Sequence, residues 1–109
     1  MKNILHSIIS FFKQKKNEVQ IDGYLVNIEP EIIEGYRTLV LEVGKKYNIR
    51  YGIHRGEYEY VGKVSENDKN NPYSHGEHLF RYCKTGEITF GYYGYTSPWE
   101  FTSIVQPLN

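Results

Sequence analysis

Two short segments of the chain combine the residue types that enzymes use for acid–base or metal chemistry. The first is His75-Gly76-Glu77-His78, whose two imidazoles and one carboxylate are groups that bind zinc. The preceding Asn71-Pro72 and the internal glycine favour a loop that runs into a strand, where residues three apart point to opposite faces. Since no second cluster supplies further ligands at a familiar spacing, we predict solvated histidines and no metal site.

The second segment is His54-Arg55-Gly56-Glu57. In a small ribonuclease, His54 or Glu57 could act as the base while Arg55 holds a phosphate. The same residues are typical of a hairpin turn, because glycine permits positive φ and charged side chains keep a turn solvated. Cys83, the only cysteine, lies in an alternating segment and is interpreted as a small buried hydrophobe. We therefore expect no catalytic residue and no cofactor, and a small ribonuclease-like enzyme stays an alternative.

One segment, residues 3–16, has the pattern of a helix. Its apolar residues recur at helical spacing, and lysines follow at its C-terminal end, where they complement the helix dipole. We expect its apolar face to cover a β-core, with contact to a membrane surface as the alternative. The apolar stretch is too short to span a bilayer and ends in lysines rather than in a small-residue cleavage site. We therefore expect neither a signal peptide nor stable membrane insertion.

From Val19 onward, apolar and polar residues alternate with the period of two that is typical of strands. The chain has no alanine, the best helix former, and 11 tyrosines, which favour pleated surfaces. About seven short strands are predicted, at residues 19–28, 37–43, 47–53, 57–65, 78–84, 88–93 and 101–106. The expected fold is mainly β (α+β): a single domain over 1–109, with the amphipathic helix 3–16 followed by antiparallel β-structure over 19–106 that forms a small barrel or a sandwich.

Charge and cysteine content narrow the function classes. The net charge is zero, so no global field attracts nucleic acid, and we expect no nucleic-acid partner. A single cysteine excludes an intramolecular disulfide and fits the cytoplasm. Residues 17–44 nevertheless form an acidic block, since six carboxylates against one arginine give a charge of −5.

Two groups of residues are candidates for binding a partner. Glu29, Glu31 and Glu34 fall in a predicted loop with two isoleucines between them, and exposed apolar residues rimmed by carboxylates suit docking to a basic protein. The glycines and proline of segment 91–99 suggest an exposed loop whose aromatic side chains could serve as rigid anchors. These predicted anchors are Tyr92, Tyr93, Tyr95 and Trp99.

Taken whole, the chain resembles the small immunity proteins that neutralise bacterial polymorphic or contact-dependent toxins. The resemblance is one of type, in size, single-domain organisation and lack of catalytic motifs, and no residue motif carries it. It implies a non-catalytic inhibitor that occludes the active site or docking surface of a cognate toxin, with a basic nuclease domain as the expected partner. Two alternatives stay open: an SH3-like small-barrel module that binds nucleic acid or protein, suggested by segments 43–47 and 60–64, and a homodimer formed through an exposed edge strand.

Overall fold

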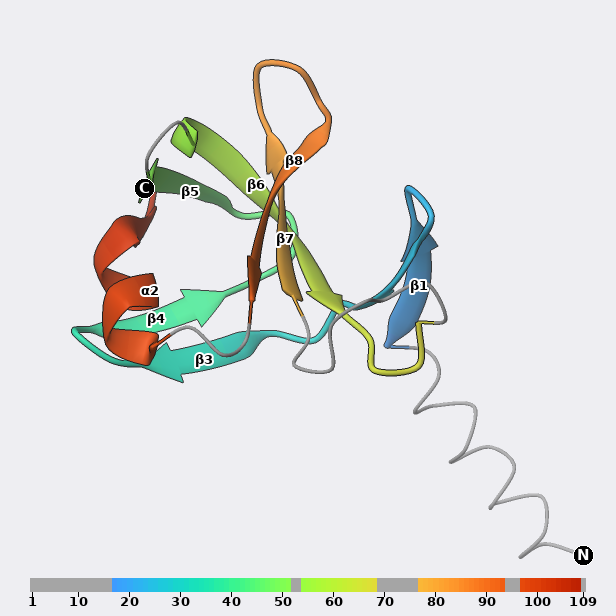
Figure 1. The fold of residues 1–109 in the computed structure, drawn as a ribbon, viewed down its shortest axis with the longest axis horizontal. Coiled ribbons are helices and arrows are strands. Elements are labelled where there is room, and N and C mark those ends of the chain that lie inside the picture. Colours follow the sequence, from blue (N-terminus) through green and yellow to red (C-terminus); the bar gives the residue numbers. More distant parts are fainter. Residues whose placement is uncertain (1–16, 52–53, 69–76, 94–96, 109) are drawn as a thin grey trace, which may run out of the picture.

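Nine strands and one short helix make up the described part of the chain (Figure 1). The computed structural model describes residues 17–51, 54–68, 77–93 and 97–108, and at 54, 77 and 89–93 it describes the backbone alone. The elements are β1 (Glu18–Ile21), β2 (Tyr24–Asn27), β3 (Glu31–Glu34), β4 (Thr38–Leu41), β5 (Lys46–Tyr51), β6 (His54–Val64), β7 (Glu77–Tyr82), β8 (Ile88–Tyr93), α2 (Pro98–Ile104) and β9 (Val105–Pro107). All strand pairs are antiparallel.

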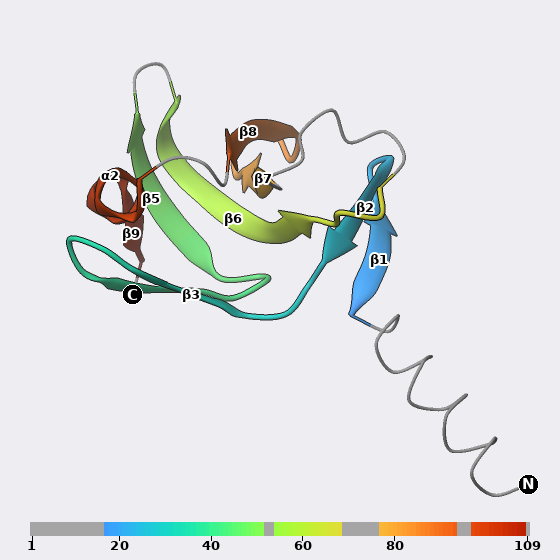
Figure 2. The same ribbon diagram turned by 60° about the horizontal axis from the view of Figure 1, so that its bottom comes forward.

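The long strand β6 organises the larger sheet. Tyr58 pairs with both β5 and β7, and Lys63 pairs with both β2 and β7, so β5 and β2 follow one another along one edge while β7 occupies the other. The register shifts between Tyr60 and Gly62, where the strand bends (Figure 2). Gly62 has φ +136°, and a Cβ there would lie 2.7 Å from the carbonyl oxygen of Asn27. Glycine therefore permits both the bend and the close approach of β2.

Two apolar clusters lie on opposite faces of this sheet. The larger cluster is enclosed by the β3–β4 hairpin, the central strands and α2, and its fully buried members are Leu39, Leu41, Ile49, Tyr60, Phe80 and Val105. The smaller cluster packs the β1–β2 hairpin against β6 and β7 through Val26, Val61, Val64 and Leu79. Since Leu79 and Phe80 are successive residues of β7, their side chains point to opposite faces and enter different clusters.

The arrangement predicted from the sequence is wrong. The protein is mostly strand, but its strands form a seven-stranded sheet and a separate two-stranded sheet, β3–β4, and these sheets do not close into a barrel. Among the described residues β1 pairs only with β2, β8 only with β7 and β9 only with β5, so the ends of the larger sheet do not pair with one another or with β3–β4. The predicted helix over 3–16 lies outside the described residues.

Three local predictions are also wrong. Residues 101–106, predicted as a strand, belong mainly to α2, and only its end continues as β9. The helix begins here because Ser97 accepts a hydrogen bond from the Trp99 N–H at 3.2 Å and Pro98 occupies the first turn. The predicted loop over 29–35 contains β3. The predicted turn at 54–56 is part of β6.

Candidate functional site

The β3–β4 hairpin presents one face to the core and the other to solvent. Its register pairs Ile33 with Leu39 and Ile32 with Val40, and paired residues share a face. Leu39 is fully buried and Ile33 packs against the main cluster. Ile32 is 67% exposed and Val40 is 40% exposed, so two apolar side chains lie next to each other on the outer face.

The tip of this hairpin is docked on α2. The hydroxyl of Thr102, a fully buried residue, accepts a hydrogen bond from the Tyr36 N–H at 2.8 Å and donates one to the Pro98 carbonyl at 2.9 Å. A Cβ on Gly35 would lie 2.7 Å from the Thr102 hydroxyl and would collide with the Pro98 carbonyl. The tip therefore requires glycine at 35 and a small hydroxyl residue at 102.

This docking brings two exposed aromatic side chains together. Tyr36, at the hairpin tip, is 57% exposed, and Trp99, in the first turn of α2, is 61% exposed. Their ring centroids lie 5.0 Å apart in an edge-to-face arrangement. Exposed tryptophan and tyrosine held in a fixed geometry are typical anchors of protein interfaces.

The exposed charges beside these side chains are carboxylates. Glu34 shares the outer face of β3 with Ile32, and Glu100 follows Trp99 in α2. Neither carboxylate forms an ion pair with another described residue. Arg37, at the hairpin tip, is partly buried, and its guanidinium carbon lies 5.5 Å from the centroid of the Tyr36 ring. We call the outer residues Ile32, Glu34, Tyr36, Val40, Trp99 and Glu100 the hairpin–helix surface.

The other predicted binding residues are placed differently. Glu31 points to the inner face and lies 3.8 Å from the Lys63 ammonium, and Glu29 is exposed and accepts a hydrogen bond from the Asn17 side chain. Tyr92 and Tyr93 belong to β8, but the placement of their side chains lies outside the description, as does Tyr95. Glu34 thus lies on the outer face of β3, two residues before the Tyr36 that contacts Trp99, whereas Glu31 lies on the inner face.

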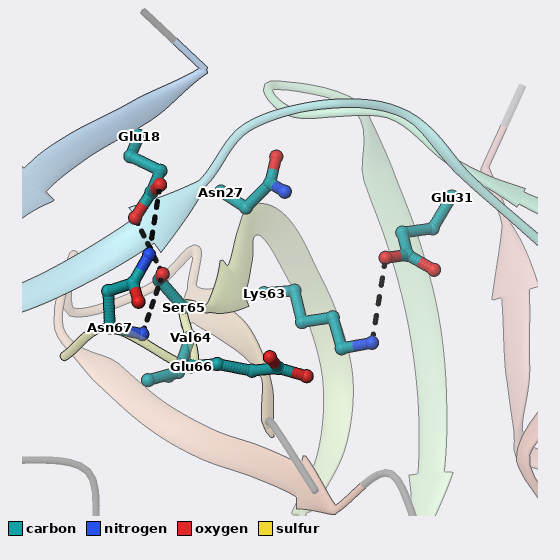
Figure 3. Close-up of a pocket in the computed structure, with 8 residues that line it drawn as sticks. All are labelled: Glu18, Asn27, Glu31, Lys63, Val64, Ser65, Glu66 and Asn67. Carbon is teal, nitrogen blue, oxygen red and sulfur yellow. Dashed lines mark hydrogen bonds and ion pairs between the residues drawn. The ribbon is translucent and has the colours of Figure 1, made fainter. Parts of the chain in front are cut away.

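A polar hollow lies where β1, β2, β3 and the end of β6 meet (Figure 3). Its volume is about 260 Å³. The Glu18 carboxylate accepts hydrogen bonds from the Ser65 hydroxyl at 2.6 Å and from the Asn67 amide at 3.5 Å, and the Lys63–Glu31 pair lines the same hollow. Most of its polar groups therefore already hold one another. No group of three or more His, Cys, Asp or Glu among the described residues is arranged to hold a metal ion.

His78 is a core residue and not the solvated histidine predicted from the sequence. It is 6% exposed, and its Nδ1 lies 3.1 Å from the Tyr60 hydroxyl. The centroid of its ring lies 5.3 Å from the centroid of the Phe101 ring. Burial lowers the pKa of His78 to about 4, and the positive charge of Lys63 acts in the same direction. A neutral, buried imidazole that already has a partner is poorly placed to act as a base or to bind zinc.

The remaining chemical candidates offer little support for catalysis. Burial and the nearby Glu57 carboxylate raise the pKa of the Cys83 thiol, which disfavours the reactive thiolate. Arg55 is exposed in β6 and pairs across the sheet with Arg50 of β5. The side chain of His54 and the whole of His75 lie outside the description.

Sequence reasoning missed Tyr36, Val40 and Thr102. A signal for the hairpin was present, because two four-residue runs, 31–34 and 38–41, are separated by three residues that include Gly35. No comparable signal marks Thr102, since its partner Tyr36 is distant in sequence.

Comparisons of the chain with protein-family models, with curated proteins and with solved structures found no match. Within the described residues, α2 is the one helix, and it is neither long nor apolar enough to cross a membrane.

Proposed function

We propose that this chain is a non-catalytic, protein-binding inhibitor, an immunity protein that works in the cytoplasm and neutralises a cognate bacterial toxin. The observation that carries the proposal is the hairpin–helix surface. It exposes four apolar side chains, Ile32, Tyr36, Val40 and Trp99, beside the carboxylates of Glu34 and Glu100. An aromatic centre with an acidic rim complements a basic protein surface, such as the phosphate-binding cleft of a nuclease.

The geometry supports inhibition by occlusion. The backbone at Tyr36 and at Trp99 is held by Thr102 and by the capped start of α2, and the two rings contact each other, so less conformational entropy would be lost when they enter a pocket. The free carboxylates would accelerate encounter with a basic domain, and the rings would slow its release.

The test is affinity capture with tagged protein from its native cells, with the captured partner quantified for wild type and variants. We expect Trp99→Ser and Glu34→Lys each to reduce capture, with Trp99→Ser costing about 2 kcal/mol or more, which is roughly thirtyfold in affinity. Matched controls lie away from this surface: Tyr24→Ser in β2, 36% exposed, and Glu87→Lys in the exposed β7–β8 turn. Equal loss of capture in the controls, or no loss in the two test variants, would refute the proposal.

The toxin-specific part of the proposal has its own test. Co-expression of the wild-type chain with the captured partner should restore growth if that partner is toxic. Co-expression of the Trp99→Ser variant should restore growth less well. A partner whose expression alone leaves growth unchanged would contradict the immunity role while leaving the binding surface intact.

A further inference from the structure

The outer edge of β3 has no strand beside it in the described part of the chain. The β3–β4 sheet has two strands, and β3 pairs with β4 alone. In both views β3 lies at the outer margin of the labelled strands (Figures 1 and 2). An unpaired edge is a row of N–H and C=O groups able to pair with an added strand.

The register fixes which backbone groups face this edge. Hydrogen-bonded and non-hydrogen-bonded pairs alternate in an antiparallel ladder. Because the Gly35 N–H donates to the Arg37 carbonyl at 3.1 Å across the turn, the bonded pairs that follow are Ile33 with Leu39 and Glu31 with Leu41. The N–H and C=O groups of Ile32 and Glu34 must then point away from β4.

An independent contact supports this assignment of bonded and non-bonded pairs. By the same alternation, the carbonyl of Val40 points away from β3, and it accepts a hydrogen bond from the Tyr47 hydroxyl at 2.8 Å. That hydroxyl also accepts a hydrogen bond from the Glu42 N–H at 2.9 Å. Tyr47 therefore covers the outer edge of β4, whereas the described chain places no such cover on β3.

We propose that β3 binds its partner by strand addition, pairing Ile32 and Glu34 with an extended basic segment of the partner protein. This inference rests on the proposed function and specifies the binding mode. Ile32 and Glu34 share the outer face, so the added strand carries an apolar residue and a lysine or arginine two positions apart. Pro30, which has no N–H, precedes β3, and the close-packed Gly35 follows it, so the added strand is short.

Charge selects a basic segment over a second copy of this chain. Glu34 is exposed and lacks a cationic partner among the described residues, and Glu29 is exposed just before the strand. Pairing of β3 with β3 of another copy would double the carboxylates along one edge, whereas lysine or arginine would neutralise them.

A synthetic peptide tests the mode without the natural partner. The probe is a short peptide in which valine and lysine alternate on one face, with threonine between them. Its first control has glutamate in place of lysine. Its second control has N-methylated amides on the bonding edge, which keeps every side chain and removes the donors. The readout is amide hydrogen exchange and chemical shift by NMR.

We expect the lysine peptide to protect the amides of Ile32 and Glu34 and to shift their resonances. N-methylation should weaken binding at least fivefold, the effect of losing about 1 kcal/mol of hydrogen bonding. Binding of the glutamate peptide at equal strength, binding without protection of these amides, or no binding at all would overturn strand addition. If raising the concentration of this protein without peptide protects the same amides, β3 pairs with a second copy of the chain, and the proposal of a basic partner segment is overturned.

Variants of the whole protein separate this inference from the proposed function. Ile32→Pro removes the outward N–H, and Ile32→Thr keeps it while removing a similar apolar side chain. With the captured partner, we expect Ile32→Pro to bind at least fivefold more weakly than Ile32→Thr, with both variants checked by thermal melting. Equal binding of the two, with binding still dependent on Trp99, would refute strand addition and leave the docking surface standing. If Ile32→Pro does not fold, the peptide experiment decides.

Discussion

Acidification should destabilise this protein through His78. In the folded state burial holds its pKa at about 4, against an ordinary value of 6.5. A histidine whose folded pKa is depressed contributes its full stability above pH 6.5, and this stability falls as the pH drops from 6.5 towards 4, because the unfolded chain binds the proton first. Between about pH 7 and about pH 5 the loss is about 2 kcal/mol, and below about pH 4 it levels off near 3 kcal/mol.

The matched variant is His78→Phe. Phenylalanine keeps a ring against Phe101 and removes the titrating group, although it leaves the Tyr60 hydroxyl without its partner. The variant is therefore expected to be less stable at neutral pH and also less sensitive to acid.

Urea unfolding at a series of pH values measures the free energy of unfolding of both proteins. Subtracting the variant's pH dependence removes the contribution of carboxylates common to both. We expect wild type to lose about 2 kcal/mol more than His78→Phe between about pH 7 and about pH 5. Parallel profiles for the two proteins would refute the placement of a neutral His78 in the core.

Three further substitutions test how the hairpins are held. Thr102→Val should lower the free energy of unfolding by about 1–3 kcal/mol, because the Tyr36 N–H loses its 2.8 Å acceptor. It should also change the fluorescence of Trp99, the only tryptophan, whereas Thr102→Ser should preserve that fluorescence. Tyr47→Phe should cost about 1–3 kcal/mol in urea unfolding, because Val40 and Glu42 lose a shared hydroxyl partner, and an unchanged midpoint would contradict that role. Gly62→Ala should lower the free energy of unfolding by at least about 1–3 kcal/mol because of the positive φ, and by more because the new Cβ would touch Val26. A melting temperature equal to that of wild type would exclude the bend at Gly62.

The alternation of apolar residues located most strands because it reports burial directly. It failed at β3, where Glu31 and Glu34 flank two isoleucines and the segment resembles a solvated loop. It also failed at α2, since Phe101, Ser103 and Val105 mimic a strand's period while the decisive signal was the cap at Ser97-Pro98. Local hydrogen bonding determined the helix, and a hydrophobicity pattern does not contain that information.

The binding residues were predictable only in part. The sequence pointed to Glu34 and Trp99 separately, and the structure places both on the hairpin–helix surface. The contact of Trp99 with Tyr36, two residues after Glu34, goes with Thr102 binding the backbone of Tyr36 from 66 residues away, which no local pattern reveals. The face occupied by His78 was equally hidden, because β7 pairs with β6 through a register shift at Gly62.

Amide hydrogen exchange of this chain, alone and bound to the partner recovered by affinity capture, tests whether the hairpin–helix surface binds the partner. Binding through the hairpin–helix surface predicts added protection over residues 31–40 and 98–102. It predicts little change in the β1–β2 hairpin or the β7–β8 turn, which lie away from this surface. Protection confined to those hairpins, with residues 31–40 and 98–102 unchanged, would show that the partner does not bind the hairpin–helix surface.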